Sequence, residues 1–151
     1  MSLKDKIQED TKTALLGGDR FAGDTLRNLK AAILDEEVAQ GKRDEGLSDE
    51  DIEKIIAREI KKRKESIAVY EQNGRAELAE QEKREADILS AYMPEQMSED
   101  ELRKLVDEKV KELGADGPQA MGQVIGAVKK QAGNTADGAM VARIVKESLG
   151  R

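Results

Sequence analysis

Apolar residues recur at three- and four-residue spacing along nearly the whole chain, which is the spacing of one face of an α-helix. The pattern is clear near the C-terminus, where the apolar positions are Val141, Ile144, Val145 and Leu149. Strands need a period of two, and no segment shows it. The two prolines, Pro94 and Pro118, fall at the edges of helical segments. The sequence therefore predicts an all-α protein.

The first part of the chain begins with two predicted helices. Gly17–Gly18 stops the first helix, because glycine does not favour a continued helix. Asp19 or Asp24 caps the second helix, which ends near Gly41. The residues that the second helix is expected to bury are Leu26, Leu29, Ile33 and Val38.

The next two helices are predicted to form an antiparallel hairpin. Ser48 caps the third helix with capping-box spacing to Asp51, and Asn73–Gly74 ends it, because both residues readily enter the left-handed conformation. The fourth helix runs over about 75–92. The residues that it is expected to turn inward are Leu78, Ala86 and Leu89.

Charged residues lie on the inward stripe of this hairpin. Arg63 and Glu85 are each eleven residues from Gly74, so we expect them to meet as a partly buried pair, with Glu82 as the alternative partner. The basic run 61–64 sweeps about 300° around its helix and cannot share one face. A structural role for Arg63 is therefore favoured over phosphate binding by the run.

A three-helix module is predicted at the C-terminal end. Ser98 caps its first helix, and Asp137 caps its last one. Gly122 and Gly126 lie four residues apart on the middle helix, where we expect them to let a neighbouring helix approach closely. Contact with RNA is the alternative role for these glycines.

The boundary between the two parts falls near Pro94, because proline disfavours helical conformation in the residue before it. We therefore predict a four-helix scaffold subdomain at 1–95 and a three-helix tail subdomain at 96–151.

The residue types present exclude several kinds of chemistry. The chain has no Cys and no His, so it offers no disulfide, zinc thiolate or thiol nucleophile. No Gly-rich Ser motif and no Gly-Lys-Ser/Thr nucleotide loop occurs. No apolar run approaches the roughly 20 residues that span a membrane, and no signal pattern is present, so a cytoplasmic location is predicted. We assign no catalytic residue, no metal and no cofactor.

Several short motifs occur in the order in which the GatB/YqeY family carries them: Arg63-Lys64-Glu65-Ser66, Tyr92-Met93-Pro94, Met121-Gly122-Gln123-Val124-Ile125 and Ala136-Asp137-Gly138. The chain resembles the free-standing YqeY-like proteins of this family. These carry the helical and tail portions of the GatB component of the glutamine-dependent aspartyl/glutamyl-tRNA amidotransferase, a carbon–nitrogen ligase, without its kinase-like core. The resemblance implies a tail that grips the outer corner of tRNA by its shape and backbone.

The tail has an excess of basic residues, although the formal net charge of the chain is −6. These residues are Lys129, Lys130, Arg143, Lys146 and Arg151. Together with Gly122 and Gly138, where a phosphate could approach the backbone, they are the candidate RNA contacts. The alternative is that Lys129, Lys130, Arg143 and Lys146 form a solvated face with no binding role. Gln123 and Thr135 stand where the family commonly has basic residues, which removes two potential phosphate contacts.

The sequence thus predicts a non-catalytic, tRNA-associated accessory module. DNA is not expected as a partner, because the last helix opens with Asp137-Gly138-Ala139-Met140 and offers few side chains for base edges. The alternative is a protein-interaction adaptor that binds no RNA, with a partner from the aminoacyl-tRNA machinery. Salt dependence separates the two, because phosphate binding weakens steeply with salt.

Overall fold

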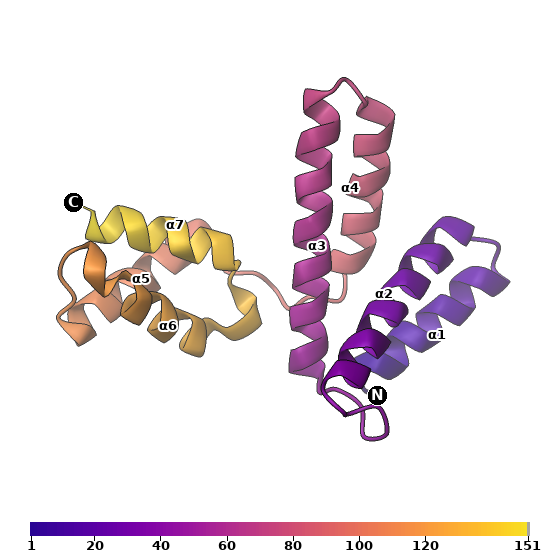
Figure 1. The fold of residues 1–151 in the computed structure, drawn as a ribbon, viewed down its shortest axis with the longest axis horizontal. Helices are drawn as coiled ribbons and strands as arrows, with labels where there is room; N and C mark the ends of the chain where they lie inside the picture. The colour runs from indigo at the N-terminus through magenta and orange to yellow at the C-terminus, as the bar shows by residue number, and fades with distance from the viewer. Residues whose placement is uncertain (151) are drawn as a thin grey trace. The chain divides into compact units, whose positions relative to one another are not determined.

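The computed structural model describes residues 1–150, which fold into seven α-helices and two short 3₁₀ helices, with no strand in that range (Figure 1). The prediction of an all-α protein is confirmed. In chain order the elements are α1 (Leu3–Leu16), α2 (Arg20–Ala39), α3 (Asp49–Gln72), α4 (Ala76–Ser90), α5 (Glu99–Leu113), η1 (Pro118–Ala120), α6 (Met121–Ala132), η2 (Gly133–Thr135) and α7 (Gly138–Leu149).

The contacts between helices divide the chain into two compact units. The N-terminal unit is Met1–Met93 and contains α1 to α4, whereas the C-terminal unit begins at Pro94 and contains α5 to α7. The two subdomains at 1–95 and 96–151 stay a prediction.

The core of the N-terminal unit is made by apolar stripes from all four helices. Its buried residues are Ile7, Leu26, Leu29, Ile33, Leu47, Ile52, Ile55, Ile56 and Leu89. The α1–α2 turn follows Gly17, and Gly18 adopts a φ of +80° that other residues rarely take. Asp19 then caps α2, because its Oδ1 accepts a hydrogen bond from the Ala22 amide at 3.1 Å.

The expectation that Val38 lies in the core is wrong. Val38 is 59 % exposed, whereas Glu37 is only 1 % exposed. At 100° per residue Glu37 lies about 40° around the helix from Ile33, and Val38 lies about 140° away. The helical period therefore turns the carboxylate inward and the valine outward.

Glu37 joins three segments of the N-terminal unit. Its Oε2 accepts a hydrogen bond from Lys4 Nζ of α1 at 2.8 Å and another from the backbone amide of Leu47 at 3.3 Å. A buried carboxylate is stable only when its hydrogen-bonding capacity is met. Glu37 thus fixes α1 and the segment before α3 to the end of α2.

The α3–α4 hairpin turns at Gly74, whose φ is +70°, and its two helices lie side by side (Figure 1). Ser48 Oγ caps α3 by accepting a hydrogen bond from the Asp51 amide at 3.2 Å. The expectation that Leu78 is buried is wrong, because it lies near the turn, where α3 and α4 pack only against each other (Figure 1). The neighbouring Ala79 is buried instead.

The structure brings Arg63 and Glu85 together inside this hairpin. Arg63 Nε lies 3.3 Å from Glu85 Oε2, and the two side chains are 12 % and 18 % exposed. The Nε–H group makes no hydrogen bond to a described residue, so this contact is an ion pair without hydrogen-bond geometry. The guanidinium does donate a hydrogen bond from Nη1 to the backbone carbonyl of Glu59 at 3.1 Å.

Glu82 shares the environment of this pair. Partial burial raises the pKa of Glu82, and the negative charge of Glu85 raises it further, while the positive charge of Arg63 lowers it. Three carboxylates, those of Glu59, Glu82 and Glu85, therefore surround one guanidinium. When all three carboxylates are ionised, they outnumber the two positive groups beside them, Arg63 and Lys62.

Replacing Glu37 by Ala is expected to lower the free energy of unfolding by about 2 to 3 kcal/mol, because the change leaves the Lys4 ammonium and the Leu47 amide without their shared acceptor. Chemical denaturation followed by circular dichroism measures the loss. Glu36→Ala is the matched control, since Glu36 makes a 3.9 Å pair with the exposed Arg58 and should contribute less than about 1 kcal/mol. Equal losses in the two variants would contradict the role of Glu37.

Glu82→Gln is expected to stabilise the protein at pH 7 and to have little effect at pH 4. Because the pKa of Glu82 is raised in the folded state, its ionisation costs stability as the pH rises from its ordinary value of 4.5 through the raised pKa. Denaturation at both pH values measures the difference. Glu80→Gln, at an exposed position of α4, is the control; a Glu82→Gln effect of equal size at pH 4 and pH 7 would refute the linkage.

Candidate nucleic-acid interface

The C-terminal unit is a three-helix module in which each helix contacts the other two. Ser98 and Glu101 form a complete capping box at the start of α5: the Ser98 hydroxyl accepts from the Glu101 amide at 3.1 Å, and the Glu101 carboxylate accepts from the Ser98 amide at 3.3 Å. The core is built from Leu102, Leu105, Val106, Val124, Val128, Val141, Ile144, Val145 and Leu149.

The expectation that Gly122 and Gly126 admit a neighbouring helix is wrong. No atom of the described residues, apart from the backbone of their own helix, lies within 4 Å of the position that a Cβ would take at either glycine. The reason is the direction of burial, because α6 packs through Val124 and Val128, on its opposite side. Both glycines lie on the surface.

Two lysines continue this glycine surface along α6. Gly126 and Lys129 follow Gly122 by four and seven residues, which places all three on one side of the helix, and Lys130 lies beside them. All four residues are exposed. We call this surface, formed by Gly122, Gly126, Lys129 and Lys130, the glycine–lysine face.

The glycine–lysine face reaches the start of α7. Lys129 Nζ lies 3.7 Å from the position that a Cβ would take at Gly138, the first residue of that helix. Backbone amides at a helix start favour anions, and the ammonium adds a positive charge beside them. Asp137 caps the same end by accepting a hydrogen bond from the Ala139 amide at 2.9 Å, so its carboxylate offsets part of this field.

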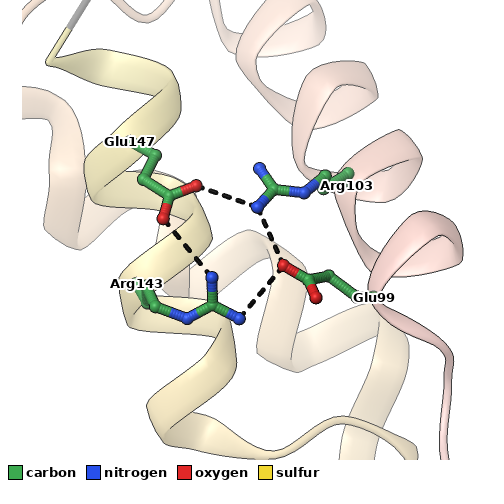
Figure 2. Close-up of polar contacts among 4 residues, drawn as sticks. All are labelled: Glu99, Arg103, Arg143 and Glu147. Atoms are coloured by element: carbon green, nitrogen blue, oxygen red, sulfur yellow. Dashed lines mark hydrogen bonds and ion pairs between the residues drawn. The ribbon is translucent and has the colours of Figure 1, made fainter.

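Arg143 is engaged in a network of four charged side chains that joins α5 to α7 (Figure 2). Its guanidinium lies 3.1 Å from a Glu99 oxygen and 3.3 Å from a Glu147 oxygen. Arg103 contacts the same two carboxylates at 2.8 and 2.9 Å. The network contains two positive and two negative groups, so Arg143 carries little uncompensated charge.

The electrostatics of the two carboxylates agree with this geometry. The hydrogen bond from Arg103 lowers the pKa of Glu99, and Arg143 lowers it further. The pKa of Glu147 is lowered chiefly by its hydrogen bond from Arg103. Sequence reasoning missed this network, although the i,i+4 spacing of Glu99 to Arg103 and of Arg143 to Glu147 was a visible signal. No pattern in the sequence predicted which charged residues of α5 and α7 would contact each other.

The other candidate residues are free of such partners. Lys129, Lys130 and Lys146 are exposed and form no ion pair with any residue in the range 1–150. Arg151 lies outside the described residues. The structure therefore places Gly122, Lys129 and Lys130 on one side of α6, and it places Lys129 beside Gly138. Arg143 differs from the lysines, because carboxylates offset its charge.

The described part of the chain contains neither a candidate metal site nor a candidate membrane-spanning helix. No group of three or more His, Cys, Asp or Glu side chains there is arranged to hold a metal ion. No helix among residues 1–150 combines the length and the apolar composition that crossing a bilayer requires.

Comparison with known proteins places the chain in one family. The family model described as Yqey-like protein matches residues 4–149. Similar relatives carry the name "Altered inheritance of mitochondria protein 41, mitochondrial". The relative from Pyrenophora tritici-repentis is 26 % identical over 148 residues, which cover 96 % of this chain and 80 % of the relative.

Two other relatives are covered less completely. The protein from Eremothecium gossypii is 32 % identical over 87 residues, or 58 % of this chain and 46 % of the relative. The protein from Lachancea thermotolerans is 30 % identical over 115 residues, or 74 % of this chain and 60 % of the relative. The chain thus spans about half the length of these two relatives. The family model covers nearly the whole chain, and the chain belongs to the YqeY-like protein family.

Proposed function

We propose that the C-terminal unit binds the backbone of structured RNA, with tRNA as the class of RNA that it binds, and that the protein acts as a non-catalytic accessory module. The glycine–lysine face and the start of α7 form the contact surface. The observation that carries the proposal is the exposure of Gly122 and Gly126 beside two unpaired ammonium groups. A surface without side chains lets a phosphate come close to the helix backbone, and lysines supply the charge that attracts it.

The residue types favour recognition of shape and backbone over recognition of sequence. Base stacking needs aromatic side chains, and the three aromatic residues of the chain, Phe21, Tyr70 and Tyr92, all belong to the N-terminal unit. Lys146 adds a further exposed charge on α7. Arg143 would join the contact only by leaving Glu99 and Glu147, so we assign it a minor part.

The proposal assigns no catalysis to this chain alone. Amide transfer from glutamine needs an activated nucleophile, and without Cys or His only an arrangement of Ser with Lys remains, for which the sequence shows no Gly-rich Ser motif. The carbon–nitrogen ligase chemistry of the larger family is context for the RNA and not an activity of these residues. The cytoplasm is the proposed place of action. Since the relatives carry "mitochondrial" in their names, a mitochondrial location is the competing placement, and cell fractionation of the tagged chain separates the two.

Replacing Lys129 and Lys130 by Ala in the full chain is expected to weaken tRNA binding and to reduce the slope of log affinity against log salt by about 1.5, since each phosphate contact contributes about 0.7 to 0.9. Fluorescence anisotropy with labelled tRNA across a salt series measures both quantities. Lys104→Ala with Lys111→Ala is the matched control, because it removes the same charge from exposed positions of α5. Equal effects of the two double variants would show binding by net charge and refute the proposed surface.

A duplex DNA of similar length tests the preference for RNA. If the unchanged protein binds tRNA no better than duplex DNA at low salt, the proposal fails. The adaptor function, in which the protein binds a partner protein and no RNA, is then the function that remains.

Gly126→Gln is expected to stabilise α6 and yet to weaken tRNA binding. Glutamine has a helix propensity better than that of glycine by about 0.5 to 1 kcal/mol, and no atom lies within 4 Å to obstruct its Cβ. The side chain would nevertheless cover the face on which a phosphate approaches the backbone. Thermal unfolding and anisotropy measured on the same sample report the two effects separately. Unchanged tRNA affinity together with a raised melting temperature would remove Gly126 from the interface.

A further inference from the structure

The second helix, α2, carries two apolar stripes, and only one of them is buried. The buried stripe contains Leu26, Leu29 and Ile33. A second stripe runs through Ala31, Leu34 and Val38 at spacings of three and four residues. All three residues are exposed; Leu34 is 43 % exposed and Val38 is 59 % exposed. An apolar stripe at helical spacing on the surface is the pattern by which one helix packs against another.

A groove lies beside this stripe, between α1 and α2, which are neighbours in the N-terminal unit (Figure 1). The groove is open to solvent on one side and has a volume of about 280 Å³. Ile7 and Ile33 line it from the core, and Leu34 extends it toward the exposed stripe. The groove and the stripe therefore form one continuous apolar surface, which we call the α1/α2 groove.

Two lysines, unpaired among the residues that the structure describes, lie beside this groove, one on each helix, and the exposed Asp5 lies on the same side of α1 as Lys12. Lys4 and Glu37 both line it, but they neutralise each other through their 2.8 Å contact. Lys30 also lines the groove and forms no ion pair within residues 1–150. On α1, Lys12 follows the groove residue Gln8 by one turn, is exposed and is likewise unpaired within the described range.

The opposite side of the stripe has the opposite sign. Asp35 lies about 100° around the helix from Leu34, is exposed and forms no ion pair within the described residues. A second copy of α2 laid antiparallel over the stripe would bring like flanks together, with Asp35 near its own equivalent. Such pairing is repulsive, so a second copy does not fit this surface well.

We propose that the α1/α2 groove docks an amphipathic helix of another protein, which places apolar side chains on Leu34 and Val38 and carboxylates along the flank that faces Lys12 and Lys30. Helices bind grooves of this kind through anchors at three- and four-residue spacing. Complementary charges at the rim fix which way the helix lies. This surface belongs to the N-terminal unit, and the inference does not depend on RNA binding by the C-terminal unit.

The test is a selection from a displayed library of helical peptides with a fixed Leu stripe and randomised flanking positions, carried out against the full-length protein. Selected peptides are expected to carry Asp or Glu along one flank. Enrichment of basic or uncharged flanks, or no enrichment over a Leu34→Gln/Val38→Gln protein, would overturn the proposal.

Affinity measurements with the selected peptide that binds most tightly locate its binding site on the protein. Leu34→Gln/Val38→Gln is expected to weaken binding by at least about tenfold. Leu16→Gln is the matched control, because Leu16 is exposed at the end of α1 and does not line the groove; its affinity should be unchanged.

A charge exchange tests the flank. Lys30→Glu should weaken binding of the acidic peptide. It should strengthen binding of the same peptide with Lys in place of its acidic residues. Three results would each overturn the assignment: loss of binding by both peptides, equal losses in Leu16→Gln and Leu34→Gln/Val38→Gln, or formation of dimers by the free protein through this face.

Discussion

Every helix in this protein must bury one narrow apolar stripe, and no helix is apolar enough to be buried on all sides. The C-terminal unit meets this constraint by closing three stripes on one another, with β-branched residues such as Val124, Val128 and Val145 filling a thin core. The N-terminal unit meets it less completely, because four helices share one core at one end and the far part of the α3–α4 hairpin has only two helices. The surfaces that remain exposed follow from these two packing arrangements.

Burial also decides what the charged residues are able to do. Glu37 is enclosed and acts as an anchor between segments, whereas Arg103 and Arg143 lie at the surface and lock α5 to α7 through Glu99 and Glu147 (Figure 2). Exposed lysines that form no ion pair within the described residues, such as Lys129, remain available to anions. Counting basic residues in the sequence overestimates the attraction for RNA, because it does not separate the paired groups from the unpaired ones.

The sequence alone was sufficient to predict features that follow from helix capping and from the position of a turn. Helix starts follow from Ser48, Ser98 and Asp137, and the meeting of Arg63 with Glu85 follows from equal distances to the turn at Gly74. It was insufficient for contacts between segments that are remote in sequence. The helical period places Glu37 on the side of Ile33, but its hydrogen-bond partners Lys4 and Leu47 lie far away in the chain. The exposure of Gly122 was open to prediction, because Val124 and Val128, at four-residue spacing, bury the other side of α6.

The charged seam of the hairpin has a consequence for how its length can change in evolution. An insertion in one arm would shift Arg63 relative to Glu85 and leave an unpaired charge between the helices. Equal insertions in both arms would keep the two residues opposite each other, but they restore the same faces only in steps of about seven residues, or two helical turns. Relatives that keep this pair are therefore expected to differ in hairpin length by matched two-turn blocks, or not at all.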